Sequence, residues 1–350
     1  MNTEIIKITN LDECDLKKLA RAAEIINYGG LVVFPTETVY GLGADATNAS
    51  ASSKIYKAKG RPSDNPLIIH ISEPSEAEKY TETSDIYYAL ARAFMPGPLT
   101  VVMPAKETVP AETRAGLSTV AVRCPSHKVA RKLIELSGVP IAAPSANLSG
   151  SPSPTKASHV IDDMMGRVDM IIDGGDADFG LESTIVKIES NDEITLLRPG
   201  KITIDDLCQV CKNIKVAGAV TEQLKENETA ISPGMKYRHY APKSPVYLLE
   251  GDPMKCAEYI SERSDGRKIA VICYADDIDV VRAHAPNVYI YKFGGKEDEL
   301  LHAHLLFDIL RDADKKDFDE IYAPLPRTEG IGLALYNRMI RAASYHIIRM

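Results

Sequence analysis

The sequence predicts a two-domain α/β protein, and three observations lead to this prediction. The chain has 350 residues, which is more than a single hydrophobic core usually holds. Its 45% hydrophobic and 26% charged residues are ordinary for a globular protein. Short apolar runs alternate with amphipathic stretches, and after residue 245 the alternation becomes regular. We expect a twisted, mixed α/β domain followed by a smaller Rossmann-like domain with a parallel sheet.

The N-terminal domain is predicted to span residues 1–214. A helix over residues 16–28 ends at the pair Gly29-Gly30, and the apolar strand at 31–34 ends at Pro35. Further strands are expected at residues 67–71, 99–103, 119–123, 139–143 and 170–172. Further helices are expected at residues 52–59, 86–94, 128–137 and 156–165. A final hairpin joins residues 184–188 to residues 194–197.

Residues 215–244 are predicted to form a linker between the domains. It contains a charged run and then the segment SPGMKYRHYAP at 232–242. Basic and aromatic residues are unusual in a passive tether, which favours glycine, serine, proline and acids. We therefore expect this segment to close over a site.

The C-terminal domain is predicted to span residues 245–350. Strands are expected at residues 246–249, 268–274, 288–293 and 320–323. Helices are expected at residues 254–263, 300–313 and 332–343. Strands that alternate with helices in this way form βαβ units with a parallel sheet.

Charge and composition exclude several classes of protein. The net charge of −8 argues against a surface that binds nucleic acid throughout, because neutralising phosphates requires a basic face. No apolar run approaches the roughly 20 residues of a membrane-spanning helix, and no signal peptide is recognisable. The six cysteines are scattered, which suits reduced thiols. We expect a cytoplasmic protein that does not bind membranes.

The densest cluster of chemically active side chains contains Lys54, Lys57, Lys59 and Arg61. Clusters of this kind are usually solvated surface. This one, however, enters a turn fixed by Pro62 and leads into a buried strand, and loops placed in this way often carry binding groups. Lysine supplies a mobile charge and arginine a planar fork for phosphate oxygens, so the cluster favours a phosphate-binding role.

The glycines after the first strand formally match a dinucleotide-binding fingerprint through Gly41, Gly43 and Ala46. We reject this interpretation, because Pro35 interrupts the strand and the residues that follow do not open a helix directly. The hydroxyls of Thr36 and Thr38 can bind a ligand or cap the local backbone. The chain contains no P-loop motif.

Other polar residues have both structural and functional interpretations at this stage. The segment PSANLSGSPS at 144–153 follows a strand, where its hydroxyl and amide groups can bind a polar ligand or simply form a turn. Arg123 and Arg198 each end a strand, as ordinary surface arginines also do. His70 lies in an apolar strand, where a core histidine is the default.

No metal site is predicted. Cys208 and Cys211 form a single CxxC pair, whereas zinc needs about four ligands. His302 and His304 lack partner ligands and are expected on a helix surface. No esterase or zinc-protease motif is present.

Seven segments together resemble the YrdC-like family, in its long two-domain form of L-threonylcarbamoyl-adenylate synthases. They are PTETVYGLG at 35–43, KGRPSDNPL at 59–67, MPGPLT at 95–100, RCP at 123–125, PSAN at 144–147, LRPG at 197–200 and the linker segment at 232–242. The resemblance covers essentially the whole chain and keeps the order of the motifs.

The resemblance implies a nucleotidyltransferase that makes L-threonylcarbamoyl-AMP and pyrophosphate from L-threonine, bicarbonate or CO₂, and ATP. It implies that the catalytic Lys-x-Arg pair falls on Lys59 and Arg61. It implies that threonine contacts fall on Thr38, His70, Arg123, Ala143 and Ser183. It implies that ATP contacts fall on Arg61, Asn65, Thr119, Ser145, Asn147, Ser153, Arg198 and Tyr237. The product would pass to proteins that modify adenosine in tRNA; the sequence leaves direct tRNA binding open.

The residue types suit this chemistry, in which positioning and charge neutralisation carry most of the catalysis. Arg123 can hold the carboxylate of threonine, and Lys59 with Arg61 can offset the triphosphate. No dedicated carboxylate cage is recognisable, so we expect Mg²⁺ to arrive with ATP. The segment at 232–242 would shield the carbamate from water as a lid. His70 is our candidate for a general base.

Two other functions are compatible with parts of the sequence. A non-catalytic RNA-binding or regulatory module could use a basic groove formed by the same cluster of lysines and Arg61, although the acidic net charge and the absence of an aromatic RNA-binding signature argue against it. Carbamoyl transfer onto another protein shares the expected fold but normally requires additional domains.

Overall fold

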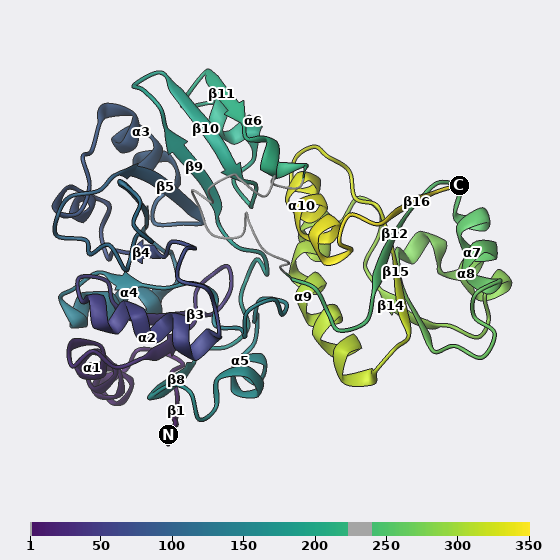
Figure 1. Ribbon diagram of the computed structural model, residues 1–350, viewed down its shortest axis with the longest axis horizontal. Coiled ribbons are helices and arrows are strands. Elements are labelled where there is room, and N and C mark those ends of the chain that lie inside the picture. The colour runs from purple at the N-terminus through teal and green to yellow at the C-terminus, as the bar shows by residue number, and fades with distance from the viewer. Residues whose placement is uncertain (1, 223–239) are drawn as a thin grey trace. The chain divides into compact units, whose positions relative to one another are not determined.

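The computed structural model describes residues 2–222 and 240–350 (Figure 1). The chain divides into two compact units, and the short segment Gly150–Pro152 belongs to the second unit together with the C-terminal part of the chain. Both units combine strands and helices, which confirms the predicted α/β class. No helix among the described residues is long and apolar enough to cross a membrane.

The first unit is built on a mixed sheet of eleven strands within the described residues. Its strands are β1 (Glu4–Lys7), β2 (Val32–Phe34), β3 (Gly41–Asp45), β4 (Ile68–His70), β5 (Leu99–Pro104), β6 (Thr119–Arg123), β7 (Ile141–Ala142), β8 (Met170–Asp173), β9 (Thr184–Ile188), β10 (Glu193–Arg198) and β11 (Asn213–Val216). The order across the sheet is β1-β8-β2-β3-β7-β4-β6-β5-β9-β10-β11. The predicted hairpin is confirmed, because β9 and β10 pair antiparallel.

The helices of the first unit begin and end close to the predicted positions. They are α1 (Glu13–Asn27), α2 (Ala49–Lys59), α3 (Asp85–Phe94), α4 (Lys128–Ser137) and α5 (Ala157–Met164). No bounds were predicted for the short helix α6 (Ile204–Cys208) or for the 3-10 turns η1 (Pro74–Lys79) and η2 (Gly218–Val220). Helix α1 begins three residues earlier than predicted, because the Asp12 side chain caps it by accepting a hydrogen bond from Asp15 N. Helices α1 and α4 bury their apolar faces against the β2–β8 end of the sheet.

Strand β3 was not predicted, because it contains two glycines. The same glycines produced the formal match to a dinucleotide-binding fingerprint, which the structure does not support. Gly41 and Gly43 lie within β3, which pairs with β2 and β7. A Cβ atom at Gly43 would stand 2.7 Å from Ile141 Cγ2 and 2.8 Å from Phe34 Cε1. Glycine therefore lets three strands pack closely, and no phosphate-binding turn forms here.

The second unit contains a five-stranded sheet in which every pairing is parallel, which confirms the predicted Rossmann-like domain. Its strands are β12 (Val246–Glu250), β13 (Ile269–Cys273), β14 (Tyr289–Lys292), β15 (Glu320–Pro324) and β16 (Ile347–Arg349), in the order β14-β13-β15-β12-β16. Its helices are α7 (Pro253–Ser261), α8 (Ile278–His284), α9 (Glu299–Lys316) and α10 (Gly332–Ala342), with the 3-10 turn η3 (Ala275–Asp277). The short elements α8 and β16 were not predicted.

The helices of this unit cover both faces of its sheet (Figure 1). Helices α7 and α8 contact each other on one face, and α9 contacts α10 on the other. The segment Gly150–Pro152 is held by hydrogen bonds from Ala241 N to Gly150 O at 3.1 Å and from Arg311 Nη2 to Pro152 O at 2.6 Å. Tyr240 stacks on Phe307 of α9 with ring centroids 5.3 Å apart.

The predicted linker is only partly covered by the described residues. Its first residues extend the first unit, because β11 crosses residue 214 and pairs with β10. Most of the segment at 232–242, including Tyr237, lies outside the described residues. The domain limits of 1–214, 215–244 and 245–350 therefore remain predictions, as does the lid.

Candidate active site

The centre of the large sheet brings His70 and Arg123 together at the ends of two parallel strands. They are register partners in β4 and β6. On the other side of β4, Ile141 of the antiparallel strand β7 pairs with His70. On the other side of β6, Thr100 of β5 pairs with Arg123. Because these strand ends meet at one place, side chains from four strands can act on one ligand.

Arg123 forms a buried ion pair with Glu37, which lies in the turn after β2. The distance between Arg123 Nη2 and Glu37 Oε1 is 2.7 Å, and the two residues are only 4% and 6% exposed. Burial alone would raise the pKa of Glu37, but the charge and hydrogen bond of Arg123 outweigh it and hold the pKa below its ordinary value. Glu37 Oε2 and Arg123 Nε have no hydrogen-bond partner among the described residues.

His70 is buried beside this ion pair and is held in its neutral form. Its Nδ1 lies 3.3 Å from Ile141 O, and its ring meets Phe34 edge-on at 6.0 Å. Burial lowers the pKa of His70 to about 3, and the positive charge of Arg123 acts in the same direction. A base this weak takes up a proton poorly near neutral pH, so the candidate role of His70 as general base loses support.

Two hydroxyl pairs complete this side of the site. Thr36 Oγ1 lies 2.9 Å from Thr38 Oγ1, which keeps the turn before β3 compact. Ser183 Oγ lies 2.7 Å from Thr100 Oγ1 and accepts a hydrogen bond of 3.2 Å from Arg198 Nη2. Four of the residues predicted to contact threonine, namely Thr38, His70, Arg123 and Ser183, therefore come from separate elements around one sheet centre.

Lys59 ties the end of α2 to the loop that follows β7. Its ammonium lies 2.5 Å from Ser145 O, 2.6 Å from Asn147 O and 3.3 Å from Asn147 Oδ1. A lysine ammonium has three N–H donors, and these three acceptors among the described residues lie within hydrogen-bond distance of this one. The Ser145 hydroxyl in turn donates to Asn147 Oδ1 at 2.5 Å. In this state Lys59 shapes the loop rather than presenting a free charge.

The turn between α2 and β4 carries Arg61 and Asn65. Gly60 ends the helix with φ of 61°, a left-handed conformation that glycine adopts without strain. Arg61 Nη2 donates to Asn65 O at 3.2 Å. The Asn65 side chain is fully buried, and neither its oxygen nor its nitrogen has a hydrogen-bond partner among the described residues. Leaving such an amide unpaired costs free energy, so this group is suited to a ligand.

The remaining predicted residues lie at different positions around the site. Ala143 follows β7, and its backbone N–H donates to Ile68 O at 2.8 Å. Ser153 donates a short hydrogen bond to Glu182 Oε1. Thr119 begins β6, about 13 Å along the strand from Arg123, and is not brought next to it. Tyr237 lies outside the described residues.

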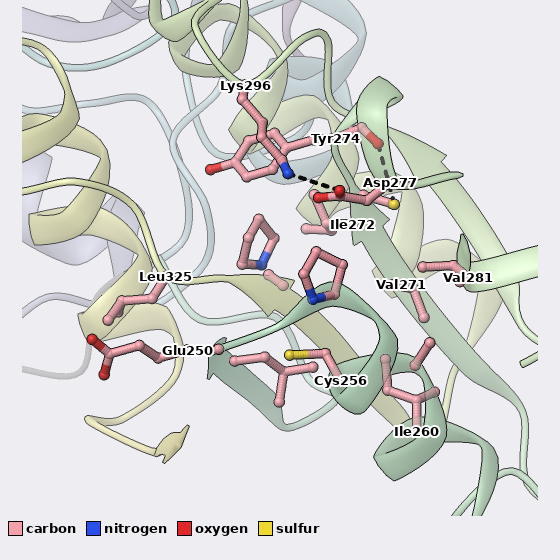
Figure 2. Close-up of a pocket in the computed structure, with 17 residues that line it drawn as sticks. Glu250, Cys256, Ile260, Val271, Ile272, Tyr274, Asp277, Val281, Lys296 and Leu325 are labelled. Carbon is pink, nitrogen blue, oxygen red and sulfur yellow. Dashed lines mark hydrogen bonds and ion pairs between the residues drawn. The ribbon is translucent and has the colours of Figure 1, made fainter. Parts of the chain in front are cut away.

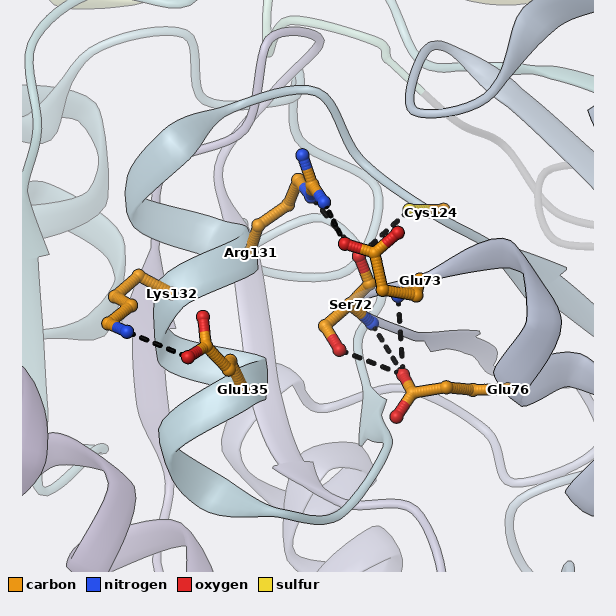
Figure 3. A network of polar contacts seen from close by, with 7 residues as sticks. All are labelled: Ser72, Glu73, Glu76, Cys124, Arg131, Lys132 and Glu135. Carbon is orange, nitrogen blue, oxygen red and sulfur yellow. Dashed lines mark hydrogen bonds and ion pairs between the residues drawn. The ribbon is translucent and has the colours of Figure 1, made fainter. Parts of the chain in front are cut away.

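A polar network fixes the strand ends that carry His70 and Arg123 (Figure 3). Ser72 O accepts hydrogen bonds from Arg131 Nε of α4 at 3.1 Å and from Cys124 Sγ at 3.3 Å. Glu76 of η1 accepts from Ser72 N and Ser72 Oγ, both at 2.9 Å. Arg131 also pairs with Glu73. The network ties α4 and η1 to the chain just after β4 and β6, so it positions the site.

Sequence reasoning missed Glu37, Thr100 and Glu182 as members of the site. Glu37 is the one acidic residue in the motif at 35–43. Its place in that motif could have identified it as a candidate site residue. Thr100 likewise stood inside the motif at 95–100, but its partner Ser183 is 83 residues away in the chain. Glu182 lay in no motif, and its partner Ser153 is 29 residues away.

Other chemically active residues do not form a second centre in the described part of the chain. No group of three or more histidine, cysteine or acidic side chains there is placed to hold a metal ion. All six cysteines are free thiols. The expectation that His302 lies on a helix surface is wrong. His302 is buried, and its Nε2 lies 2.8 Å from Gly295 O because the apolar face of α9 turns it inward.

A twisted mixed sheet with buried arginine, lysine and amide groups at its centre, joined to a parallel-sheet domain, defines a two-domain YrdC-like protein. Residues 24–200 match the Sua5/YciO/YrdC family model, whose description is "Telomere recombination". Residues 202–344 match the model described as "Threonylcarbamoyl-AMP synthase, C-terminal domain". The chain belongs to this family, as the resemblance of its motifs implied.

Curated relatives match nearly the full length of the chain. The threonylcarbamoyl-AMP synthase of Pyrococcus abyssi is 44% identical over 340 residues, which cover 95% of this chain and 96% of that protein. The threonylcarbamoyl-AMP synthase of Bacillus subtilis is 44% identical over 335 residues, which cover 95% and 94%.

Solved structures support the fold of both units. The crystal structure of P. abyssi Sua5 complexed with L-threonine is 42% identical, covers 99% of this chain and 100% of that one, and has a TM-score of 0.90. The E. coli YciO structure covers 56% of this chain at 24% identity with a TM-score of 0.50. That second likeness concerns the fold alone.

Proposed function

We propose that the chain synthesises L-threonylcarbamoyl-AMP and pyrophosphate from L-threonine, bicarbonate or CO₂, and ATP. The observation that carries this proposal is the match, over 95% of the chain, to two proteins named threonylcarbamoyl-AMP synthase. The enzyme is accordingly a nucleotidyltransferase, and its product serves threonylcarbamoyl-adenosine modification of tRNA.

The amino-acid end of the site is assigned to the buried Glu37–Arg123 pair. An α-amino acid carries one cationic and one anionic group side by side. Among the described residues, Glu37 Oε2 is an acceptor without a hydrogen-bond partner and Arg123 Nε is a donor without one, so Glu37 can bind the ammonium and Arg123 the carboxylate. The imidazole of His70 lies next to this pair. The hydroxyl group of Ser183 bonds to Thr100, the cross-strand partner of Arg123, and both groups can contact the side chain of threonine.

The nucleotide end is assigned to Arg61, Asn65 and Arg198. The buried amide of Asn65 offers both a donor and an acceptor. The guanidinium groups of Arg61 and Arg198 supply the fixed positive charge that a triphosphate requires. Lys59 holds the Ser145–Asn147 loop in place, which makes it a positioning residue in the observed state.

The reaction needs little covalent work from the protein. The ammonium of threonine first loses a proton to solvent, and the neutral amine then attacks CO₂. A second proton leaves to solvent as the carbamate forms, and a carbamate oxygen then attacks the α-phosphorus of ATP. The bond between that phosphorus and the bridging oxygen of the β-phosphate breaks, and pyrophosphate leaves. The protein contributes by aligning the reactants and neutralising charge. Because the described residues form no metal cage, we propose that Mg²⁺ enters bound to ATP.

The wider setting of the enzyme also remains a proposal. We infer that the adenylate passes to proteins that complete the tRNA modification, because a mixed anhydride of this kind is consumed by acyl transfer. We propose a cytoplasmic location on the basis of the six free thiols. The −8 net charge gives no support to broad tRNA binding by the chain itself.

Threonine-dependent release of pyrophosphate tests the proposed function. The full chain is incubated with ATP, Mg²⁺ and bicarbonate, with and without L-threonine, and pyrophosphate is measured. Release that requires both threonine and bicarbonate is the expected result. No release, together with tRNA binding that weakens steeply with salt, would favour the RNA-binding alternative.

A further inference from the structure

The second unit contains a cavity at the carboxyl ends of its parallel strands (Figure 2). Its volume is about 260 Å³. The wall includes residues at the ends of three strands: Glu250 of β12, Cys273 of β13 and Pro324 of β15. Lys296, which follows β14, closes one side. None of the residues discussed in the active site contributes to this cavity.

The cavity lies where the topology of the sheet favours ligand binding. Strand β12 leads into α7 on one face of the sheet, and its neighbour β15 leads into α10 on the other face. Connections that leave adjacent strands in opposite directions open a crevice between the strand ends. Residues that follow β12 and β15 line the cavity, so it occupies this crevice.

Most of the cavity wall is apolar. Ile260 and Val271 are buried, and Val281 of α8 closes the same side. Cys256 of α7 lies on the wall and remains partly exposed (Figure 2). A wall of this kind favours an aliphatic or aromatic group, whose burial contributes about 25 cal/mol for each Å² removed from water.

Two opposite charges stand together at one end of the cavity. Lys296 Nζ lies 2.8 Å from Asp277 Oδ1, and the side chains are 44% and 18% exposed. A dashed line in Figure 2 marks this ion pair. The Lys296 end of this pair is exposed to water, and surface ion pairs contribute only about 0–1 kcal/mol, so a ligand can take over the lysine at modest cost. Burial raises the pKa of the neighbouring Tyr274 to about 12, so its hydroxyl stays protonated and can donate.

The chain itself blocks the positions where a phosphate would bind. In folds of this class, phosphates sit at the helix N-termini beside the crevice. The Asp252 carboxylate accepts from Met254 N and Lys255 N at the start of α7. The Glu299 carboxylate accepts from Gly332 N at the start of α10. A nucleotide phosphate would meet a carboxylate at either place.

We propose that this cavity binds a free α-amino acid with an apolar side chain. The carboxylate of such a ligand would pair with Lys296, its ammonium with Asp277, and its side chain with the apolar wall. A volume of about 260 Å³ is smaller than the roughly 300–1,000 Å³ of pockets for drug-sized ligands, which suits a ligand of this size. The proposal concerns a second site and does not depend on the reaction assigned to the first unit.

Protection of Cys256 from alkylation tests the proposal and reports on this cavity alone. The full chain is treated with iodoacetamide at pH about 8.5, because burial raises the pKa of Cys256, and each thiol is followed by mass spectrometry. L-Leucine at saturation is expected to slow alkylation of Cys256 severalfold. The exposed Cys14 and Cys208 of the first unit are internal controls and should react at an unchanged rate.

Variants and ligand analogues identify the groups that bind. Lys296→Met should raise the leucine concentration for half-protection about tenfold or more, because a charged hydrogen bond is lost. Lys292→Met, on a strand residue outside the cavity, is the matched control and should leave it unchanged. Glycine, which lacks the side chain, should not protect Cys256.

Three results would overturn the proposal. One is an unchanged alkylation rate of Cys256 at 10 mM of each of L-leucine, L-isoleucine and L-phenylalanine, tested separately. This concentration is about tenfold above a dissociation constant of about 1 mM, which is that of a weak ligand. A second is protection by ATP in place of amino acids, which would identify a phosphate site. A third is equal protection by leucine in the Lys296→Met variant.

Discussion

Glu37 Oε1 and Arg123 Nη2 lie 2.7 Å apart in a buried ion pair, and each side chain keeps one polar atom unpaired among the described residues. Removing two charges from water costs several kcal/mol for each ion, and a well-packed apolar pair would often be at least as stable. The pair is therefore poorly explained by stability. Its unused donor and acceptor suit an amino acid that carries both charges.

Substitution of Glu37 by glutamine should damage both stability and threonine binding. The change leaves the Arg123 guanidinium buried without a counter-charge, which costs about 3–5 kcal/mol in the free energy of unfolding. It also removes the proposed partner of the substrate ammonium, so KM for threonine should rise more than KM for ATP. Urea unfolding and steady-state kinetics measure the two effects.

The exposed pair of Lys132 and Glu135 provides the control for this prediction. Glu135→Gln should change the free energy of unfolding by less than about 1 kcal/mol and leave both KM values unchanged. If Glu37→Gln behaves in the same way, the pair is neither a structural nor a binding element.

Substitution of Asn65 by leucine should separate ligand binding from folding. The buried amide lacks a partner among the described residues, so replacing it with an apolar group of similar size should leave the melting temperature equal or higher. The same change removes a proposed ATP contact and should raise KM for ATP about tenfold to a hundredfold. Calorimetry and kinetics on the same preparation measure both. A lower melting temperature with unchanged KM would show that the amide is structural.

Substitution of Lys59 by methionine should loosen the loop at Ser145 and Asn147. Three acceptors lose their donor, and the free energy of unfolding should fall by about 2–4 kcal/mol. Lys57→Met, on the exposed face of the same helix, should cost less than about 0.5 kcal/mol. Hydrogen exchange in the loop should increase only in the first variant. Equal exchange in both variants would contradict the positioning role.

Chelation of divalent metals should stop the reaction without unfolding the protein. Because the described residues hold no cluster of metal ligands, EDTA should leave the melting temperature of the ATP-free protein unchanged. The same treatment should abolish pyrophosphate release, and added Mg²⁺ should restore it. A clear fall in melting temperature with EDTA alone would point to a metal held by the chain.

Regular sequence patterns predicted the fold better than they predicted the site. The C-terminal domain was recognisable because its strands and helices alternate at nearly constant spacing. Strand β3 was missed because Gly41 and Gly43 are rare in strands, and their purpose, close packing against Phe34 and Ile141, appears only in three dimensions. His302 was misplaced because its partner, Gly295 O, lies before the helix begins.

The site could be predicted only where its residues fell into recognisable motifs. The resemblance supplied Arg123 and Lys59, but it did not indicate their partners. Glu37 and Arg123 are 86 residues apart, and Lys59 and Asn147 are 88 residues apart. Pairings over such distances depend on strand order, which a single sequence does not encode in any local pattern.

The buried imidazole of His70 should make the stability of the protein depend on pH. Its pKa is about 3 in the folded state and about 6.5 in an unfolded chain. Because the pKa of His70 is lower in the folded state, its contribution to the free energy of unfolding is fully present above pH 6.5. This contribution is lost as the pH falls toward 3, since the unfolded chain then binds a proton that the folded protein does not. Between pH 7 and pH 5 this amounts to about 2 kcal/mol in the free energy of unfolding.

Comparison with His70→Gln isolates this contribution from all other titrating groups. Urea unfolding at pH 7 and at pH 5 gives, for each protein, the loss in the free energy of unfolding between the two pH values. This loss should be larger for the wild type than for His70→Gln by about 2 kcal/mol. The neutral imidazole also predicts that the rate profile of the wild type shows no step near pH 6.5 that His70→Gln removes. If such a step exists and disappears in the variant, His70 titrates near neutral pH in the working enzyme and regains its candidacy as general base.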